Sequence, residues 1–229
     1  MLKLYIGNKN YSSWSMRPWV LMTQKGIAFD EVMVPFGNEV DGVDEAFKRT
    51  IRAVNPAGTV PALVDGDLAV WDTLAIAEYL AEQFPELHLW PREAAVRARA
   101  RSVVAEMHAG FTALRSRCGM NIEAHLPEQG RIIWRDNPGV RANVARISAM
   151  WTELLAEHGG PMLLGDFSIA DAYYAPVCMR LRTFDLPVSQ VVQDYVARVA
   201  ALPGVKAWID GALAERSFVA HDEPYRAGR

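Results

Sequence analysis

The first eighty residues alternate between short apolar runs and segments with helical periodicity. Apolar runs at 2–7 and 28–34 predict two strands, and the segment 15–26 between them has apolar residues at the spacing of a helix. A strand–helix–strand order predicts a parallel pair of strands joined by a right-handed crossover. A short helix is predicted next, around Val43 to Ile51, between loops rich in Gly and Pro.

Two further apolar runs, 60–64 and 67–71, lie on either side of Asp65-Gly66. This dipeptide is favoured in tight β-turns, so the two runs predict a hairpin. Pro61 cannot donate to a strand ladder, which assigns it to the first residues of its strand. The apolar residues that follow Thr73 recur every four positions and predict a helix.

After Pro91 the pattern is helical throughout, and the Ser168-to-Asp171 segment has the spacing of a helix capping box. The other predicted helices cover 138–158, 188–201 and 203–215. The polar tail from Ala220 to Arg229 is expected on the surface. The pattern therefore predicts an α/β domain over residues 1–82 and an all-α domain over residues 91–229.

Composition says little about the fold, but it excludes several classes of function. Hydrophobic residues make up 51% of the 229 residues and charged residues 22%, as in ordinary globular proteins. The net charge of −3 shows no footprint of nucleic-acid binding, and no apolar run is long enough to span a membrane. The two cysteines, Cys118 and Cys178, have no metal-site spacing, and no signal peptide precedes the first strand. We expect a cytoplasmic protein with free thiols and no metal.

The segment Ser12-Ser13-Trp14-Ser15 opens the first helix and is the first candidate for chemistry. With Ser15 as N-cap, Pro18 falls in the first turn, where its missing N–H does no harm. Ser12 and Ser13 then lie just outside the positive end of the helix, where hydroxyls and backbone N–H groups suit an anion. An ordinary N-cap cluster explains the serines equally well.

The order of these motifs resembles that of the cytosolic glutathione transferases over nearly the whole chain. Each piece is weak alone, but their order and spacing together are specific. The pieces are Ser12-Ser13-Trp14-Ser15 with Lys25-Gly26-Ile27, Asn55-Pro56 with Val60-Pro61-Ala62-Leu63, the segment from Asp72 to Leu80, and the segment from Gly165 to Asp171. The resemblance implies a thioredoxin-like N-terminal domain followed by an all-α domain.

Within that family the serine motif is similar to those of the zeta and tau classes. In these classes the catalytic serine stands thirteen residues before the Lys of Lys-Gly, which selects Ser12 here. Its hydroxyl would donate to the sulfur of glutathione and stabilise the thiolate, because a free thiol with a pKa of about 8.5 is mostly protonated at neutral pH. Ser13 is the rival donor, and the N–H groups of Trp14 are further candidates.

The resemblance also implies the residues that hold glutathione. Asp72 would pair with the γ-glutamyl ammonium, and Thr73 would hold the neighbouring carboxylate. Val60 would pair its backbone with the cysteinyl part, next to a cis Pro61. Thr59 stands where the family often has Lys or Gln, so a contact to the glycyl carboxylate is missing or is supplied elsewhere.

A small hydrophobic electrophile would bind between the two domains. The residues assigned to this pocket by position are Trp14, His108, Phe111 and Arg115. The family forms two-fold homodimers, and the basic face with Arg97 and Arg101 offers a charged contact surface.

Three activities are compatible with the resemblance. The first is a glutathione transferase, and the second is a glutathione-dependent peroxidase or isomerase that uses the same site. The third is a non-catalytic binding protein of the same fold, which the joint presence of Ser12, Asp72 and Thr73 disfavours. Zeta-class members usually carry Cys where this chain has Trp14, which weighs against zeta-type isomerase activity.

Overall fold

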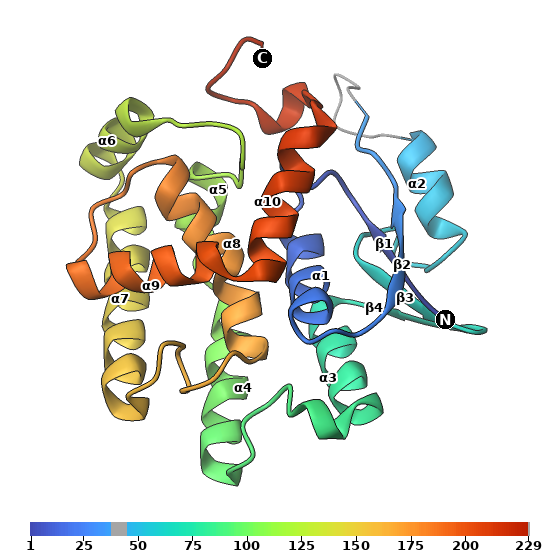
Figure 1. Cartoon of the computed structure of the whole chain (residues 1–229). Helices are drawn as coiled ribbons and strands as arrows, with labels where there is room; N and C mark the ends of the chain where they lie inside the picture. The colour runs from blue at the N-terminus through green and yellow to red at the C-terminus, as the bar shows by residue number, and fades with distance from the viewer. Residues whose placement is uncertain (38–44, 229) are drawn as a thin grey trace.

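A computed structural model describes residues 1–37 and 45–228 and shows a four-stranded sheet beside a larger set of helices (Figure 1). The sheet contains β1 (Leu2–Ile6), β2 (Phe29–Met33), β3 (Ala62–Asp65) and β4 (Leu68–Trp71), in the order β2-β1-β3-β4. β1 runs parallel to β2 and antiparallel to β3, and β3 and β4 form a hairpin. The predicted parallel pair and the predicted hairpin are both confirmed.

Three helices complete the α/β domain, namely α1 (Ser13–Gln24), α2 (Glu45–Arg52) and α3 (Thr73–Gln83). Helix α1 lies between the sheet and the helical domain, whereas α2 lies on the far side of the sheet (Figure 1). The predicted start of α2 at Val43 falls outside the described residues. The helical layer that carries Ser12 and Ser13 therefore faces the second domain.

The prediction that Ser15 caps α1 is wrong. Ser12 is the N-cap, and its hydroxyl accepts the Ser15 backbone N–H at 3.3 Å. The Ser15 hydroxyl points back to the sheet instead, where it accepts the Gly7 N–H at 3.1 Å. Pro18 consequently lies in the second turn, where its missing N–H leaves a helical carbonyl without its donor.

The second domain is helical throughout. Its helices are α4 (Ala94–Ala109), α5 (Thr112–Arg117), α6 (Pro127–Asp136), α7 (Pro138–His158), α8 (Ile169–Thr183), α9 (Gln190–Ala201) and α10 (Pro203–Glu215), with short 3₁₀ turns at Pro85–Leu87 and Ala220–Asp222. The periodic pattern does not reveal the break between α4 and α5, where Phe111 adopts a positive φ of 56°. No helix within the described part of the chain is long and apolar enough to cross a bilayer.

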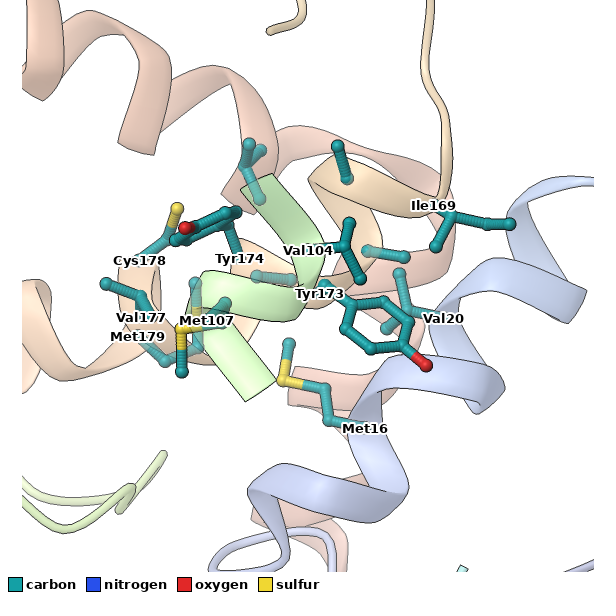
Figure 2. Packing of buried hydrophobic residues seen from close by; sticks show 14 of the residues in the cluster. Met16, Val20, Val104, Met107, Ile169, Tyr173, Tyr174, Val177, Cys178 and Met179 are labelled. Atoms are coloured by element: carbon teal, nitrogen blue, oxygen red, sulfur yellow. The ribbon is translucent and has the colours of Figure 1, made fainter. Parts of the chain in front are cut away.

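The core runs without interruption from one domain into the other. Figure 2 shows Met16 and Val20 of α1 packed beside Tyr173 of α8, with residues of α4 on the other side. Met16, Val20 and Tyr173 are fully buried. Separating the domains would expose this apolar surface to water, so the two faces of the space between them are held in a fixed relation.

Asp171 anchors α8 at its N-terminus. Its carboxylate accepts the backbone N–H of Ser168 and that of Leu163, each at 3.0 Å, and the hydroxyl of Tyr195 at 2.9 Å. The Ser168 hydroxyl in turn accepts the Ala170 N–H. The predicted capping box is confirmed, and it fixes the helix that carries Tyr173 and other residues of the domain boundary.

The expectation that the C-terminal tail lies wholly on the surface is wrong at Glu223. Its side chain is buried and accepts hydrogen bonds from the Tyr11 hydroxyl at 2.7 Å and the Asn121 amide at 2.9 Å. Arg226 forms an ion pair with the same carboxylate. Tyr11 and Asn121 come from two distant parts of the chain, so the local polarity of the tail could not indicate these contacts.

Candidate active site

A cavity of about 460 Å³ opens between the two domains beside the start of α1. Its lining residues include Tyr11, Ser12, Ser13, Trp14, Phe36, Lys48, Thr59, Val60, Arg115, Met120, Arg180, Val219, His221 and Asp222. Of the residues assigned from sequence, the cavity brings together the serines, Trp14, the Thr59–Val60 segment and Arg115. Both domains therefore contribute to one space, as a site for two reactants requires.

Ser12 lines the cavity at the N-terminus of α1. Its hydroxyl donates to Ser15 Oγ at 2.8 Å while accepting the Ser15 N–H. Ser15 Oγ is fixed in turn by the Gly7 N–H at the end of β1. The Ser12 hydroxyl is thus held at the positive end of a helix by a network that reaches the sheet.

Ser13 lies in a different environment from Ser12. Its hydroxyl accepts a hydrogen bond from Nη2 of Arg180 at 3.1 Å. Arg180 comes from α8 and also donates to the carbonyl oxygens of Cys118 and Arg115. Burial lowers the pKa of Arg180 to about 10, so its guanidinium is still charged at neutral pH. Arg180 therefore ties the serine loop to the helical domain.

The Thr59–Val60 segment forms another wall of the cavity. The Val60–Pro61 peptide bond is cis, as the resemblance implies. The Asn55 amide donates to the Thr59 carbonyl at 3.0 Å, and Lys48 Nζ donates to the Gly58 carbonyl at 2.9 Å. Lys48 thus brings a cation to the side of the cavity where Thr59 supplies none.

Asp72 and Thr73 begin α3, outside the residues that line the cavity. Asp72 has a positive φ of 68°, and its Oδ1 caps the helix by accepting the Leu74 N–H at 2.8 Å. The Thr73 hydroxyl is buried and has no hydrogen-bond partner among the described residues. A strained acidic residue next to an unsatisfied hydroxyl is an arrangement that a polar ligand would complete.

His108 and Phe111 do not line the cavity formed by the described residues. The His108 ring packs edge-on against Trp14 with the ring centroids 5.1 Å apart, and its Nε2 lies 3.4 Å from Asp72 Oδ2. Burial lowers the pKa of His108 despite the opposing effect of Asp72. Phe111 is 7% exposed and belongs to the hydrophobic core. His108 therefore connects Trp14 to the α3 terminus, whereas Phe111 has a packing position.

Sequence reasoning missed several residues of the cavity wall. Tyr11, Lys48 and Arg180 all line it, together with Val219 and Asp222 near the C-terminus. Arg180 has only a weak signal in the sequence, because it is one of two arginines, with Arg182, in a helical segment that is otherwise mostly apolar. Lys48 and Asp222 lie in polar segments that have no local pattern pointing to the cavity.

Comparison with known protein families supports the resemblance to the glutathione transferases. A model of the glutathione S-transferase N-terminal domain matches residues 11–83, and a model of the C-terminal domain matches residues 94–211. The chain belongs to the glutathione S-transferase family. The family and fold predicted from the sequence are confirmed, and glutathione is the co-substrate of this family.

Individual relatives add detail to the family assignment. An Arabidopsis thaliana protein named glutathione S-transferase Z1 is 31% identical over 73% of this chain and 74% of its own length. A Caenorhabditis elegans protein named probable maleylacetoacetate isomerase is 25% identical over 87% of this chain and 92% of its own length. A glutathione transferase homolog from Burkholderia gl BGR1, solved with bound glutathione, shares the fold with a TM-score of 0.67 at 23% identity, over 93% of this chain and 98% of that one.

Proposed function

We propose that this glutathione S-transferase conjugates the thiolate of glutathione to small electrophiles. The observation that carries the proposal is the position of Ser12, which caps α1 and lines the same cavity as Val60. A hydroxyl donor and a helix N-terminus together favour a bound thiolate over a thiol. Lowering a thiol pKa by about two units requires roughly 2.7 kcal/mol, which one hydrogen bond to a charged acceptor and a dipole supply.

The Ser12–Ser15 pair explains how Ser12 becomes available to sulfur. Ser12 donates to Ser15 Oγ, 2.8 Å away, so its hydrogen is engaged within the loop. A hydroxyl carries one hydrogen and two lone pairs, and both hydroxyls rotate. When Ser12 turns toward the thiolate, Ser15 donates its own hydrogen back to Ser12 Oγ, and the pair stays hydrogen-bonded. Ser15 is therefore a positioning residue in this mechanism.

The other proposed contacts fix glutathione along the edge of the α/β domain. Asp72 pairs with the γ-glutamyl ammonium, and the unsatisfied Thr73 hydroxyl holds the adjacent carboxylate. The Val60 backbone pairs with the cysteinyl part, beside Thr59 and the cis Pro61. Lys48, which lines the cavity, supplies the cation for the glycyl carboxylate. This assignment gives each charge of the tripeptide an oppositely charged or hydrogen-bonding partner.

A glutathione-dependent isomerase is the second candidate, favoured by the relative named probable maleylacetoacetate isomerase. Both reactions begin when the thiolate adds to an electrophilic carbon. They differ in the next step, since an isomerase expels the thiolate again and a transferase retains the new C–S bond. Trp14 occupies the cavity wall next to the serines and narrows the space in which an adduct could rotate.

We also propose a homodimer in the cytoplasm. The buried, unlinked Cys118 and Cys178 agree with a reducing compartment. The proposed contact face contains Arg97 and Arg101. Arg101 forms a bidentate ion pair with Glu78 of α3, in which its Nε and Nη2 lie 2.9 and 3.0 Å from the two carboxylate oxygens. Arg97 donates to backbone carbonyls within its own chain. The subunit contact would therefore use the outer surface of this ion pair.

Two measurements on the purified protein test the proposed function. It should be retained on immobilised glutathione and eluted by free glutathione. It should also accelerate the reaction of glutathione with 1-chloro-2,4-dinitrobenzene above the uncatalysed rate, with release of chloride. A protein that binds glutathione without accelerating this or any other thiol addition is a binding protein, and one that does neither contradicts the whole assignment.

A further inference from the structure

His108 and Asp72 bring the two domains into polar contact beside the Trp14 ring. His108 lies in the last turn of α4, in the helical domain, and Asp72 is the N-cap of α3, in the α/β domain. His108 Nε2 is 3.4 Å from Asp72 Oδ2. The imidazole also packs edge-on against the indole of Trp14, which lines the cavity. The two polar atoms are therefore one side chain away from the cavity that contains Ser12.

The Asp72–His108 pair is open to a ligand. Asp72 Oδ1 is engaged by the Leu74 N–H, whereas Oδ2 faces His108. The Asp72 side chain is 50% exposed and that of His108 is 22% exposed, so solvent reaches the pair. Their separation of 3.4 Å exceeds the usual N–H···O distance of about 2.9 Å. Both atoms therefore keep hydrogen-bonding capacity for a third group.

The surroundings of His108 determine which ring nitrogen carries a hydrogen. Burial lowers the pKa of His108, and the cations Arg17 and Arg115 act in the same direction, against Asp72. The ring is therefore neutral at neutral pH and has a single N–H. Nδ1 is buried and has no hydrogen-bond partner among the described residues. A hydrogen on Nδ1 would be a buried donor without an acceptor, whereas a hydrogen on Nε2 faces a carboxylate. This difference assigns the hydrogen to Nε2.

The pair consequently presents an acceptor, Asp72 Oδ2, beside a donor, His108 Nε2–H. An α-amino acid head group presents the complementary arrangement, because one carbon atom carries both an ammonium donor and a carboxylate acceptor. The γ-glutamyl end of glutathione is such a head group, and the proposed function already assigns its ammonium to Asp72. A carboxylate has two oxygens, so one of them can accept from Thr73 and the other from His108.

We propose that His108 is a further glutathione-binding residue, whose Nε2–H donates to the carboxylate of the γ-glutamyl head group. The proposal rests on the proposed transferase function and names the group of the thiol substrate that the helical domain recognises. Asp72 and Thr73 belong to the α/β domain and His108 to the helical domain, so the head group bridges the two domains. The preferred thiol therefore carries a free α-amino acid group at its γ end.

Variants of His108 separate binding from packing. His108→Phe keeps an aromatic ring against Trp14 and removes both nitrogens, and His108→Gln keeps a donor close to the position of Nε2. His125→Phe makes the same substitution at an exposed position of the helical domain and serves as the control. The dissociation constant of glutathione, measured by calorimetry, should rise about fivefold or more in His108→Phe. It should rise less in His108→Gln and stay unchanged in His125→Phe.

Two truncated thiols identify the ligand group that His108 contacts. Glutaryl-cysteinylglycine lacks the ammonium, and γ-aminobutyryl-cysteinylglycine lacks the carboxylate. Removing the carboxylate should weaken binding to the wild type by a factor that is about fivefold smaller, or less, in His108→Phe, because that variant has already lost the contact. Removing the ammonium should weaken binding by the same factor in both proteins. Asp72→Asn should show the opposite pattern.

Each outcome of these measurements has a distinct meaning. If removal of the carboxylate weakens binding equally in the wild type and in His108→Phe, the proposed contact is wrong. The same conclusion follows if His108→Phe reduces the effect of removing the ammonium instead. In both cases the transferase function stands as long as glutathione binds and is conjugated. If the wild type neither binds glutathione nor conjugates it, the proposed function fails, and the role of His108 fails with it.

A fold defect is identified by circular dichroism and by the melting temperature of each variant. If His108→Phe does not fold, the same measurements on His108→Leu decide, since leucine also lacks a donor. Loss of packing alone would weaken the binding of all three thiols by a similar factor. Only a direct contact changes the effect of removing one group of the ligand.

Discussion

Asp72 caps α3, and the proposed function gives its charge a second, separable role in binding glutathione. Its Oδ1 caps α3 through the Leu74 N–H, and its charge is assigned to the glutathione ammonium. Asp72→Asn keeps a capping oxygen and removes the charge, whereas Asp72→Ala removes both. Asp67→Asn, at an exposed position of the preceding hairpin, removes one charge from the same domain and serves as the control.

The structure sets the size of each effect. Loss of the cap costs about 1 kcal/mol, which lowers the melting temperature of a chain of this length by about 2–4 °C. Loss of a hydrogen bond to a charged partner costs about 1.5–3 kcal/mol when buried, but the Asp72 side chain is 50% exposed, so we expect the lower end. The dissociation constant of glutathione should therefore rise about five- to twentyfold in both Asp72 variants.

The two roles are measured independently: isothermal calorimetry gives the dissociation constant of glutathione, and thermal unfolding gives the melting temperature. We expect Asp72→Asn to melt near the wild-type temperature and to bind glutathione as weakly as Asp72→Ala. If Asp72→Asn binds like the wild type and only Asp72→Ala is weakened, the residue acts as a cap and not as the ammonium partner. An unchanged dissociation constant in both variants removes Asp72 from the site.

Three further predictions follow from individual contacts. Lys48→Gln should weaken glutathione binding several-fold in calorimetry through loss of a carboxylate partner, whereas Arg49→Gln, on the exposed side of α2, should not. Tyr11→Phe removes the donor to the buried Glu223 and should lower the free energy of unfolding in urea by about 1–3 kcal/mol, and an unchanged midpoint would show that the tail is not held by this bond. Light scattering at micromolar concentration should give twice the chain mass, and a monomer would contradict the proposed homodimer.

Much of the fold was predictable because local patterns determine it. The helix predicted at 138–158 begins at Pro138 and ends before the Gly159-Gly160 pair, and α7 has these bounds in the structure. The capping residues Ser168 and Asp171 are close in sequence, so their pairing also shows locally. The hairpin is another local feature, set by its Asp-Gly turn.

Other features depend on partners that are distant in sequence. Ser12 caps α1 in place of Ser15 because Ser15 is engaged by Gly7 at the end of a strand. Glu223 is buried because its carboxylate accepts hydrogen bonds from Tyr11 and Asn121, which lie more than a hundred residues away in the sequence. The cavity wall also depends on segments that are distant in sequence, since Arg180 reaches the cavity only when α8 packs on α1. Such contacts arise from tertiary packing and leave no periodic pattern.

The most direct test of the account is the pH–rate profile of conjugation for Ser12→Ala beside Ser13→Ala and Ser15→Ala. Ser12→Ala should lower kcat/KM at neutral pH about ten- to a hundredfold, or roughly 1.4–2.7 kcal/mol, and the rate should partly recover as the pH rises. Ser15→Ala should give a smaller shift in the same direction, since it removes the partner of Ser12, and Ser13→Ala should leave the apparent pKa of the bound thiol in place. If the pH–rate profile shifts in Ser13→Ala and not in Ser12→Ala, then Ser13 stabilises the thiolate and the assignment to Ser12 is wrong. Unshifted profiles in all three variants would contradict the serine mechanism itself.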